Sequence, residues 1–82
     1  MITARQTRAA RALLGWSQET LADKALVSLT ALKRLESENG LKVHEATRDQ
    51  VRRALESNGI VLLATDRGEG VLLVNDRDGA QR

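Results

Sequence analysis

The sequence contains no cysteine, tyrosine or phenylalanine, and it has one tryptophan among its 82 residues. Without cysteine, neither a disulfide framework nor a thiolate metal site is available, and the single His44 cannot form a histidine cluster. We therefore expect no metal site and no cofactor. One aromatic side chain is also too few to stack the bases of single-stranded nucleic acid, which argues against that class of ligand.

Catalytic patterns and long apolar runs are missing as well. The chain has no phosphate-cradling glycine loop, no paired catalytic carboxylates and no activated nucleophile, so we expect that it is not an enzyme. Its N-terminus lacks the apolar core of a signal peptide, and no apolar run approaches the ~20 residues that cross a bilayer. Together with the lack of cysteine, these features predict a cytoplasmic protein without a membrane partner.

The length of the chain predicts one small domain. A domain of this size buries only about 60% of the surface that its unfolded chain exposes, so its stability is marginal without further support. Disulfides and metals are excluded, which leaves oligomerisation as the source of that support.

The net charge is only +2, but it is unevenly distributed. Residues 1–59 hold ten lysines and arginines against seven aspartates and glutamates, whereas residues 60–82 hold three against four. The basic excess lies in the part of the chain that we expect to be helical, as a surface facing phosphates requires. By itself this signal is modest.

Helical spacing of apolar residues predicts four helices, over about residues 3–14, 17–25, 28–37 and 47–57. Thr3 with Gln6, and Thr47 with Gln50, match the capping box that opens a helix. Gly15 is expected to end the first helix. The inward face of that helix is expected to carry Ala10, Leu13 and Leu14.

Residues 17–36 have the pattern of two short helices joined by a tight corner. Ser17 and Ser28 stand where each helix needs an N-cap, and apolar residues fall where the two helices must pack on each other. The second helix carries Lys33 and Arg34 on its outer side, so it can enter a DNA major groove. This pattern predicts a helix-turn-helix.

Two apolar runs, residues 60–64 and 71–74, flank turn-forming residues at 66–70 and predict a β-hairpin over about 60–74. Neither run alternates, so both hairpin faces are apolar, and only one can rest on the helices of its own chain. We expect a second copy to cover the other, through Ile60, Val61, Leu62, Leu63, Val71, Leu72, Leu73 and Val74. The alternative is burial of both faces within one monomer. Residues 75–82 are expected to be a polar tail.

Residues 1–40 resemble the DNA-binding domain of the Xre-type, or phage-repressor, helix-turn-helix family. The resemblance rests on Arg11, residues 14–18, Leu21-Ala22, Val27-Ser28 and residues 32–36. It implies a mainly α fold, with a four-helix lambda-repressor-like domain followed here by the C-terminal β-hairpin that dimerises, in a single domain over 1–74. The later segment is similar to short bacterial regulators whose last element is β.

The same resemblance implies roles for particular residues. The base-reading positions are Leu29, Thr30, Lys33 and Arg34. It also gives Ser17, Gln18 and Ser37 as phosphate-binding positions. Apart from the resemblance, we expect phosphate contacts from Ser28, at the start of the recognition helix, and from Arg8, on the basic face of the first helix. For the three basic residues among them, the alternative is an ordinary solvated face.

Two further positions are implied by the resemblance. Arg11 and Glu36 match a family ion pair that ties the first helix to the recognition helix. Leu26 is a departure, because the family usually has glycine at this corner, where φ is often positive. Either the corner tolerates the strain, or the second helix runs on and the corner opens differently.

These features predict a homodimeric, sequence-specific regulator of transcription. It would bind an inverted repeat in double-stranded DNA, with helix 28–37 in the major groove. The alternative is an antitoxin whose hairpin or tail binds a toxin protein and which regulates its own operon. The polar tail is short for wrapping a partner, which favours the plain regulator.

Overall fold

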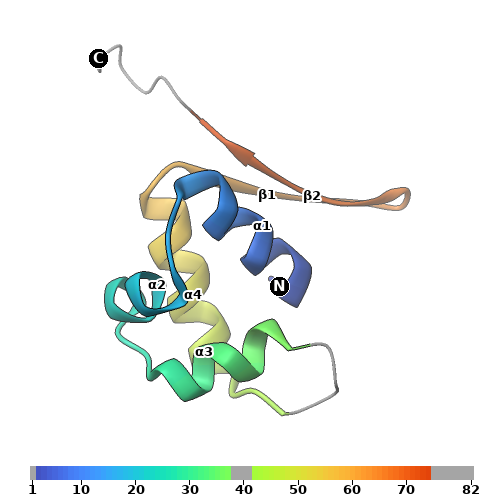
Figure 1. The fold of residues 1–82 in the computed structure, drawn as a ribbon. Coiled ribbons are helices and arrows are strands. Elements are labelled where there is room, and N and C mark those ends of the chain that lie inside the picture. The colour runs from blue at the N-terminus through green and yellow to red at the C-terminus, as the bar shows by residue number, and fades with distance from the viewer. Residues whose placement is uncertain (1, 38–41, 75–82) are drawn as a thin grey trace, which may run out of the picture.

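The computed structural model describes residues 2–37 and 42–74, which form four helices followed by a two-stranded antiparallel hairpin (Figure 1). These are α1 (Ala4–Leu14), α2 (Gln18–Ala25), α3 (Leu29–Glu36), α4 (Glu45–Ser57), β1 (Ile60–Thr65) and β2 (Gly68–Leu73). The predicted mainly α fold with a C-terminal hairpin is therefore confirmed. The expected tail at 75–82 lies outside the described residues. None of the helices within the described ranges combines the length and apolar character needed to span a membrane.

α1 begins with the predicted capping box and ends at the predicted glycine. Thr3 Oγ1 accepts from the Gln6 N–H, and Gln6 Oε1 accepts from the Thr3 N–H, both at 3.1 Å. Gly15 follows the helix in the left-handed region, at φ 71°, where a residue without a Cβ has no steric cost.

The buried face of α1 differs from the prediction at one position. Gln6, Thr7 and Ala10 are the buried residues of this helix, and Leu13 is 47% exposed. The expectation that Leu13 faces inward is therefore wrong. Leu13 lies seven residues after Gln6 and so shares its side of the helix, but that side is buried at Gln6 and left in solvent at Leu13, in the last turn of α1.

α4 begins two residues earlier than predicted. Its N-cap is His44, which makes no side-chain cap bond, and Thr47 lies inside the first turn. The second capping box is therefore wrong. Glu45 in the first turn favours the earlier start through the helix dipole. Gln50 does not turn back toward Thr47, because its Nε2 donates to the Ala25 carbonyl of α2 at 3.3 Å.

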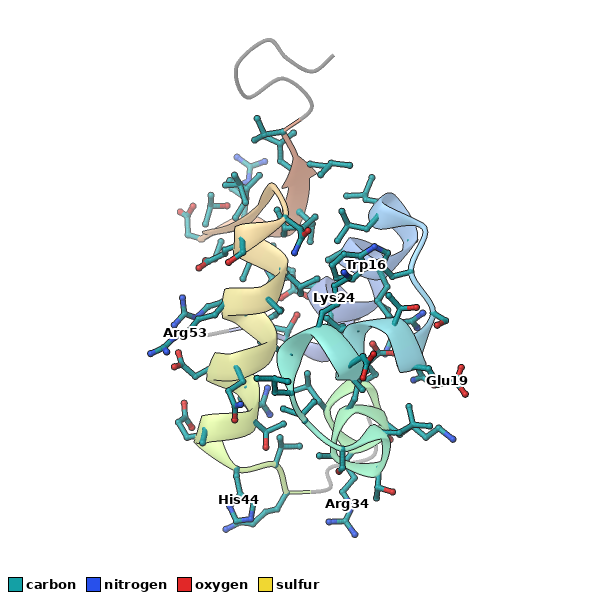
Figure 2. The ribbon with its side chains drawn as sticks, turned by 90° about the vertical axis from the view of Figure 1, so that its left-hand side faces the viewer. Trp16, Glu19, Lys24, Arg34, His44 and Arg53 are labelled. Carbon is teal, nitrogen blue, oxygen red and sulfur yellow. The ribbon has the colours of Figure 1, made fainter. Side chains whose placement is uncertain are left out.

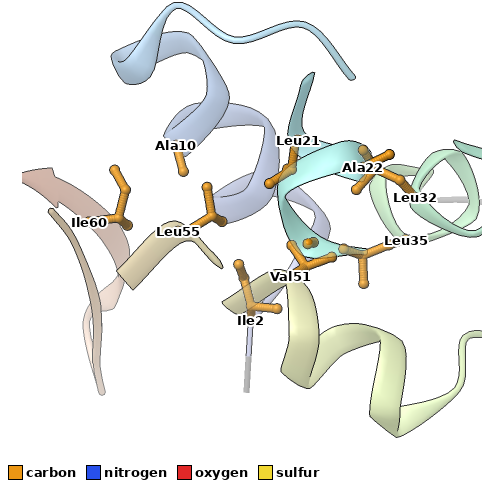
Figure 3. Close-up of a cluster of buried hydrophobic side chains, with 10 residues drawn as sticks. Ile2, Ala10, Leu21, Ala22, Leu32, Leu35, Val51, Leu55 and Ile60 are labelled. Carbon is orange, nitrogen blue, oxygen red and sulfur yellow. The ribbon is translucent and has the colours of Figure 1, made fainter. Parts of the chain in front are cut away.

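A single hydrophobic core joins the four helices to the start of the hairpin (Figure 3). Its buried members are Ile2, Ala10, Leu21, Ala22, Ala25, Leu32, Leu35, Val51, Leu55 and Ile60. Ile2 lies before the first helix, and the sequence pattern did not indicate it. Arg48 Nη1 donates to the Ile2 carbonyl at 2.9 Å, which holds this segment against α4.

The hairpin has the predicted extent, but its strands are longer and its turn is shorter than the sequence predicted. The strands remain paired up to Thr65 and Gly68, so the turn contains only Asp66 and Arg67. The five-residue turn expected from the sequence is too long, since its glycines extend β2 instead. Thr65 Oγ1 supports the turn by accepting from the Arg67 N–H at 3.1 Å.

The two faces of the hairpin have different surroundings. Register partners share a face, so alternate pairs define an inner and an outer face. The inner face, which packs against the core, carries Ile60, Leu62, Val71 and Leu73. The outer face, 38% to 51% exposed, carries Val61, Leu63, Leu72 and Val74. The eight residues expected at a dimer interface thus include four that their own chain covers and four that it leaves in solvent.

Candidate nucleic-acid interface

α2 and α3 are the two helices of the helix-turn-helix, and both carry the predicted serine caps. Ser17 Oγ accepts from the Thr20 N–H, and Ser28 Oγ accepts from the Ala31 N–H, both at 3.0 Å. Ser17 Oγ also donates to Thr20 Oγ1 at 3.1 Å. Both serines are exposed, so each helix begins at the surface of the domain.

Leu26 closes the corner between α2 and α3 in the left-handed region, at φ 60° and ψ 42°. Of the two possibilities that the sequence left open, the corner therefore tolerates the strain. The Leu26 N–H donates to Asp23 O at 3.3 Å and the Val27 N–H to Ala22 O at 3.0 Å, which are the two bonds of a Schellman motif. Gln50 Nε2 of α4 approaches Leu26 O at 3.5 Å from outside the corner.

α3 buries one flank and leaves the other in solvent. Leu32 and Leu35 lie in the core, and Leu29 is half-buried against it. The exposed residues at the predicted base-reading positions are Thr30, Lys33 and Arg34. Their spacing of three and four residues places them on one side of the helix. Figure 2 shows Arg34 pointing away from the body of the domain.

Arg11 of α1 and Glu36 at the end of α3 form a two-point ion pair. Arg11 Nε donates to Glu36 Oε2 at 2.7 Å and Nη2 donates to Oε1 at 2.9 Å. The Glu36 side chain is 3% exposed. The pKa of Arg11 lies above its ordinary value, chiefly because Glu36 accepts its hydrogen bonds. Arg11 Nη1 also donates to the Trp16 carbonyl at 3.1 Å, so one guanidinium joins α1, the segment before α2, and α3.

Two predicted phosphate-binding residues converge on the same glutamate. Gln18 Nε2 donates to Glu36 Oε1 at 3.0 Å, and Arg8 Nη1 donates to the Glu36 backbone oxygen. Glu36, the last residue of α3, is therefore hydrogen-bonded to Gln18, the first residue of α2. Ser37, the remaining predicted phosphate residue, is the C-cap of α3, and its N–H donates to Arg34 O at 3.2 Å.

The arginines of α4 are engaged within the fold. Arg52 pairs with Asp49 and, at 2.9 Å, with Glu56, while Arg53 pairs with Asp49 at 2.9 Å. The pKa of Arg52 is raised, mainly because Asp49 accepts its hydrogen bond. These pairs lie along a single helix, so they balance charge within α4 rather than extend the α3 surface.

Sequence reasoning missed the tertiary roles of two glutamines. Gln6 joins α1 to the hairpin, and Gln50 reaches the corner of the helix-turn-helix. Their only signal was a position three residues after a threonine, which a capping box explains equally well. The threonine spacing therefore hid the tertiary role of each amide, which Gln6 has in addition to its cap and Gln50 has in place of one.

A capped α2, a tight corner and an α3 with an exposed flank define a helix-turn-helix domain of the kind that binds double-stranded DNA. Residues 8–44 match the protein-family model described as helix-turn-helix. Over this segment the match supports the resemblance that the sequence predicted, to the Xre, or lambda-repressor-like, helix-turn-helix family of DNA-binding transcription regulators. The chain matches no curated protein and no solved structure.

Proposed function

We propose that this protein is a sequence-specific transcriptional regulator that acts as a homodimer on an inverted repeat. The observation that carries the proposal is the exposed flank of α3. Its polar and basic residues face solvent while the opposite flank is fixed in the core, as a helix that docks in a major groove requires.

Thr30, Lys33 and Arg34 are proposed to read base edges. Arg34 has the fork of donors that pairs bidentately with guanine O6 and N7, and Lys33 donates to the same acceptors. Thr30 has a hydroxyl for a base edge or a phosphate. Leu29, half-buried at the start of α3, keeps part of its side chain available for a thymine methyl group.

The start of α2 is proposed to bind a phosphate. A helix N-terminus offers unpaired N–H groups and the positive end of its dipole, and Gln18 is the first residue of α2. Because Glu36 also holds Gln18, a phosphate bound here fixes the position of α3 along the groove. Ser17, Ser28, Ser37 and Arg8 are proposed as further backbone contacts.

The outer face of the hairpin is proposed as the dimer interface. It is apolar and exposed, and none of the residues that it carries within the two strands is charged, so it meets a copy of itself without like-charge repulsion. A hairpin of two strands is marginal in water unless its apolar surface is covered. A twofold pair of this kind gives two recognition helices, which matches an inverted repeat.

Selection from a pool of random duplexes tests the DNA-binding proposal. We expect the wild-type protein to enrich an inverted repeat with half-sites about 34 Å apart. Arg34→Ala should then lose about 1–3 kcal/mol on the enriched sequence and relax the preference at one base position in each half-site. Equal losses on enriched and random DNA would show that Arg34 contacts only the DNA backbone.

Arg8→Ala should weaken binding to all DNA sequences equally and make the salt dependence shallower by about one phosphate contact.

A mass measurement in solution tests the dimer. We expect twice the chain mass of 9.0 kDa for the wild type. Leu72→Lys, in the middle of the outer face, should reduce the mass to that of one chain, because two like charges would meet across the twofold axis. Ala12→Lys adds the same charge at an exposed position of α1 and should leave the dimer intact. A monomeric wild type would refute the dimer and favour the antitoxin alternative.

A further inference from the structure

Gln6 is a buried polar residue where α1 meets the hairpin. The residue is 4% exposed, and both ends of its amide are engaged. Oε1 accepts from the Thr3 N–H, as described above, while Nε2 donates to the backbone oxygens of Leu63 and Gly70, each at 3.0 Å. One side chain therefore joins the start of α1 to both strands.

The two carbonyls that Gln6 binds belong to a single rung of the hairpin. Leu63 and Gly70 are register partners, so the amide bridges β1 and β2 at one level. The side chain of Leu63 belongs to the outer face. The two hydrogen bonds from Gln6 therefore fix a residue pair of the hairpin whose Leu63 side chain contributes to the proposed dimer interface.

The same helix also holds the recognition helix. Arg8 and Arg11 of α1 contact Glu36 at the end of α3, two and five residues after Gln6. α1 lies between the hairpin and α3 and contacts both (Figure 1). A rigid helix fixed to the hairpin at one place and to α3 at another determines the angle between them.

We propose that Gln6 is a positioning residue that fixes the hairpin relative to α3 and so sets the half-site spacing that the dimer accepts. This inference rests on the dimeric regulator proposed above. α4 runs into β1 through Asn58 and Gly59, and this connection by itself attaches the hairpin at one end. The inner face also packs against the core, and Arg5 of α1 pairs with Glu69 of β2 at 3.9 Å. To these contacts Gln6 adds directional hydrogen bonds to the backbone of both strands, closer to the turn than the α4 connection. In a twofold dimer the direction of the hairpin decides where each recognition helix meets the DNA.

Gln6→Glu removes this attachment while keeping the helix cap. The substituted carboxylate retains an oxygen for the Thr3 N–H, but its other oxygen faces two carbonyl oxygens and has no proton to donate. Gln6→Met removes the donor without adding charge, in case the glutamate prevents folding. Thr3→Ala is the matched control, since it removes the hydroxyl that caps the Gln6 N–H and leaves the contact with the hairpin untouched.

A distance measurement within one chain tests the attachment without DNA. Because the sequence has no cysteine, Lys33→Cys and Asp66→Cys place spin labels only on α3 and at the hairpin turn. The labelled chain is diluted into unlabelled protein, so that only distances within a chain contribute. We expect a narrow distance distribution for the unmodified Gln6 background and for Thr3→Ala, and a broadened one for Gln6→Glu and Gln6→Met. Distributions as narrow as the parent in both Gln6 variants would overturn the proposal.

Binding to the enriched inverted repeat tests the consequence for spacing. The parent protein should bind less tightly when the spacer is lengthened or shortened by one base pair. In the Gln6 variants this preference should fall by up to roughly thirtyfold, which is the worth of two ordinary hydrogen bonds, while the affinity for an isolated half-site is unchanged. A preference equal to that of the parent would refute the positioning role. If no sequence is enriched, the proposed regulator fails, and the distance measurement still decides whether Gln6 holds the hairpin.

Discussion

Replacing Leu26 with glycine should stabilise the protein, because the corner of the helix-turn-helix holds a leucine at φ 60°. A residue with a Cβ costs about 1–2 kcal/mol in this conformation. Glycine removes that cost but loses about 0.4–1 kcal/mol through the greater freedom of its unfolded chain. The Leu26 side chain is 82% exposed, so little hydrophobic burial is lost. The net expectation is a gain of about 0.5 kcal/mol, or an increase of roughly 2–4 °C in the melting temperature.

Leu26→Ala is the control that isolates the backbone conformation. It removes most of the side chain but keeps a Cβ at the same φ, so the glycine variant should exceed it by about 0.5–1 kcal/mol. Urea unfolding followed by the fluorescence of Trp16, the only aromatic residue, measures both changes. All variants are compared at one protein concentration, because the stability of a dimer depends on concentration.

The comparison has a clear refuting result. If the alanine variant is as stable as the glycine variant, the corner stores no strain and any gain comes from removing an exposed leucine. If both are less stable than the wild type, the leucine side chain makes a contact worth more than the strain. DNA affinity should stay unchanged in the glycine variant, because the Schellman bonds use backbone atoms alone.

Two further substitutions test the fold around the site. Glu36→Gln should cost about 3 kcal/mol in urea unfolding, at the lower end for a buried pair because Arg11 remains partly exposed; an unchanged stability would show that the pair is idle. Gly59→Ala should cost about 2 kcal/mol or more, because φ is +96° and the added Cβ would lie 3.2 Å from Val74 O. Gly15→Ala has a similar φ with open space around it, so equal losses in thermal unfolding would discount the Gly59 contact.

Local signals predicted the helix-turn-helix well. Ser17, Ser28 and the Thr3–Gln6 pair are caps, and capping depends on residues within one turn of the chain. The same local logic failed for Thr47 and Gln50, because the Gln50 amide bonds to α2 instead of to its own helix. A three-residue spacing does not distinguish a side chain that caps its helix from one that reaches another element.

The hairpin shows the other limit of sequence reasoning. Two apolar runs without alternation predicted that both faces are apolar, which requires only the strand period of two. Which face is covered depends on how α1 and α4 pack, and that arrangement comes from long-range contacts such as the bonds from Gln6 to Leu63 and Gly70. Leu13 was misplaced for a related reason, since it shares a side of α1 with the buried Gln6, and only the tertiary packing shows that this side is uncovered in the last turn.

Glu36 makes the stability of the domain and its proposed DNA binding depend on the same contacts. It receives Arg11 from α1 and Gln18 from α2, and it lies at the end of the helix that carries Arg34. A variant at Glu36 is therefore expected to lose affinity for every DNA sequence, because the start of α2, which is proposed to bind a phosphate, and the flank of α3 lose their common support. A variant at Arg34 removes no buried contact and should change affinity in a sequence-dependent way. The ratio of binding to enriched and random DNA thus separates a residue that reads bases from one that holds the reading helix in place.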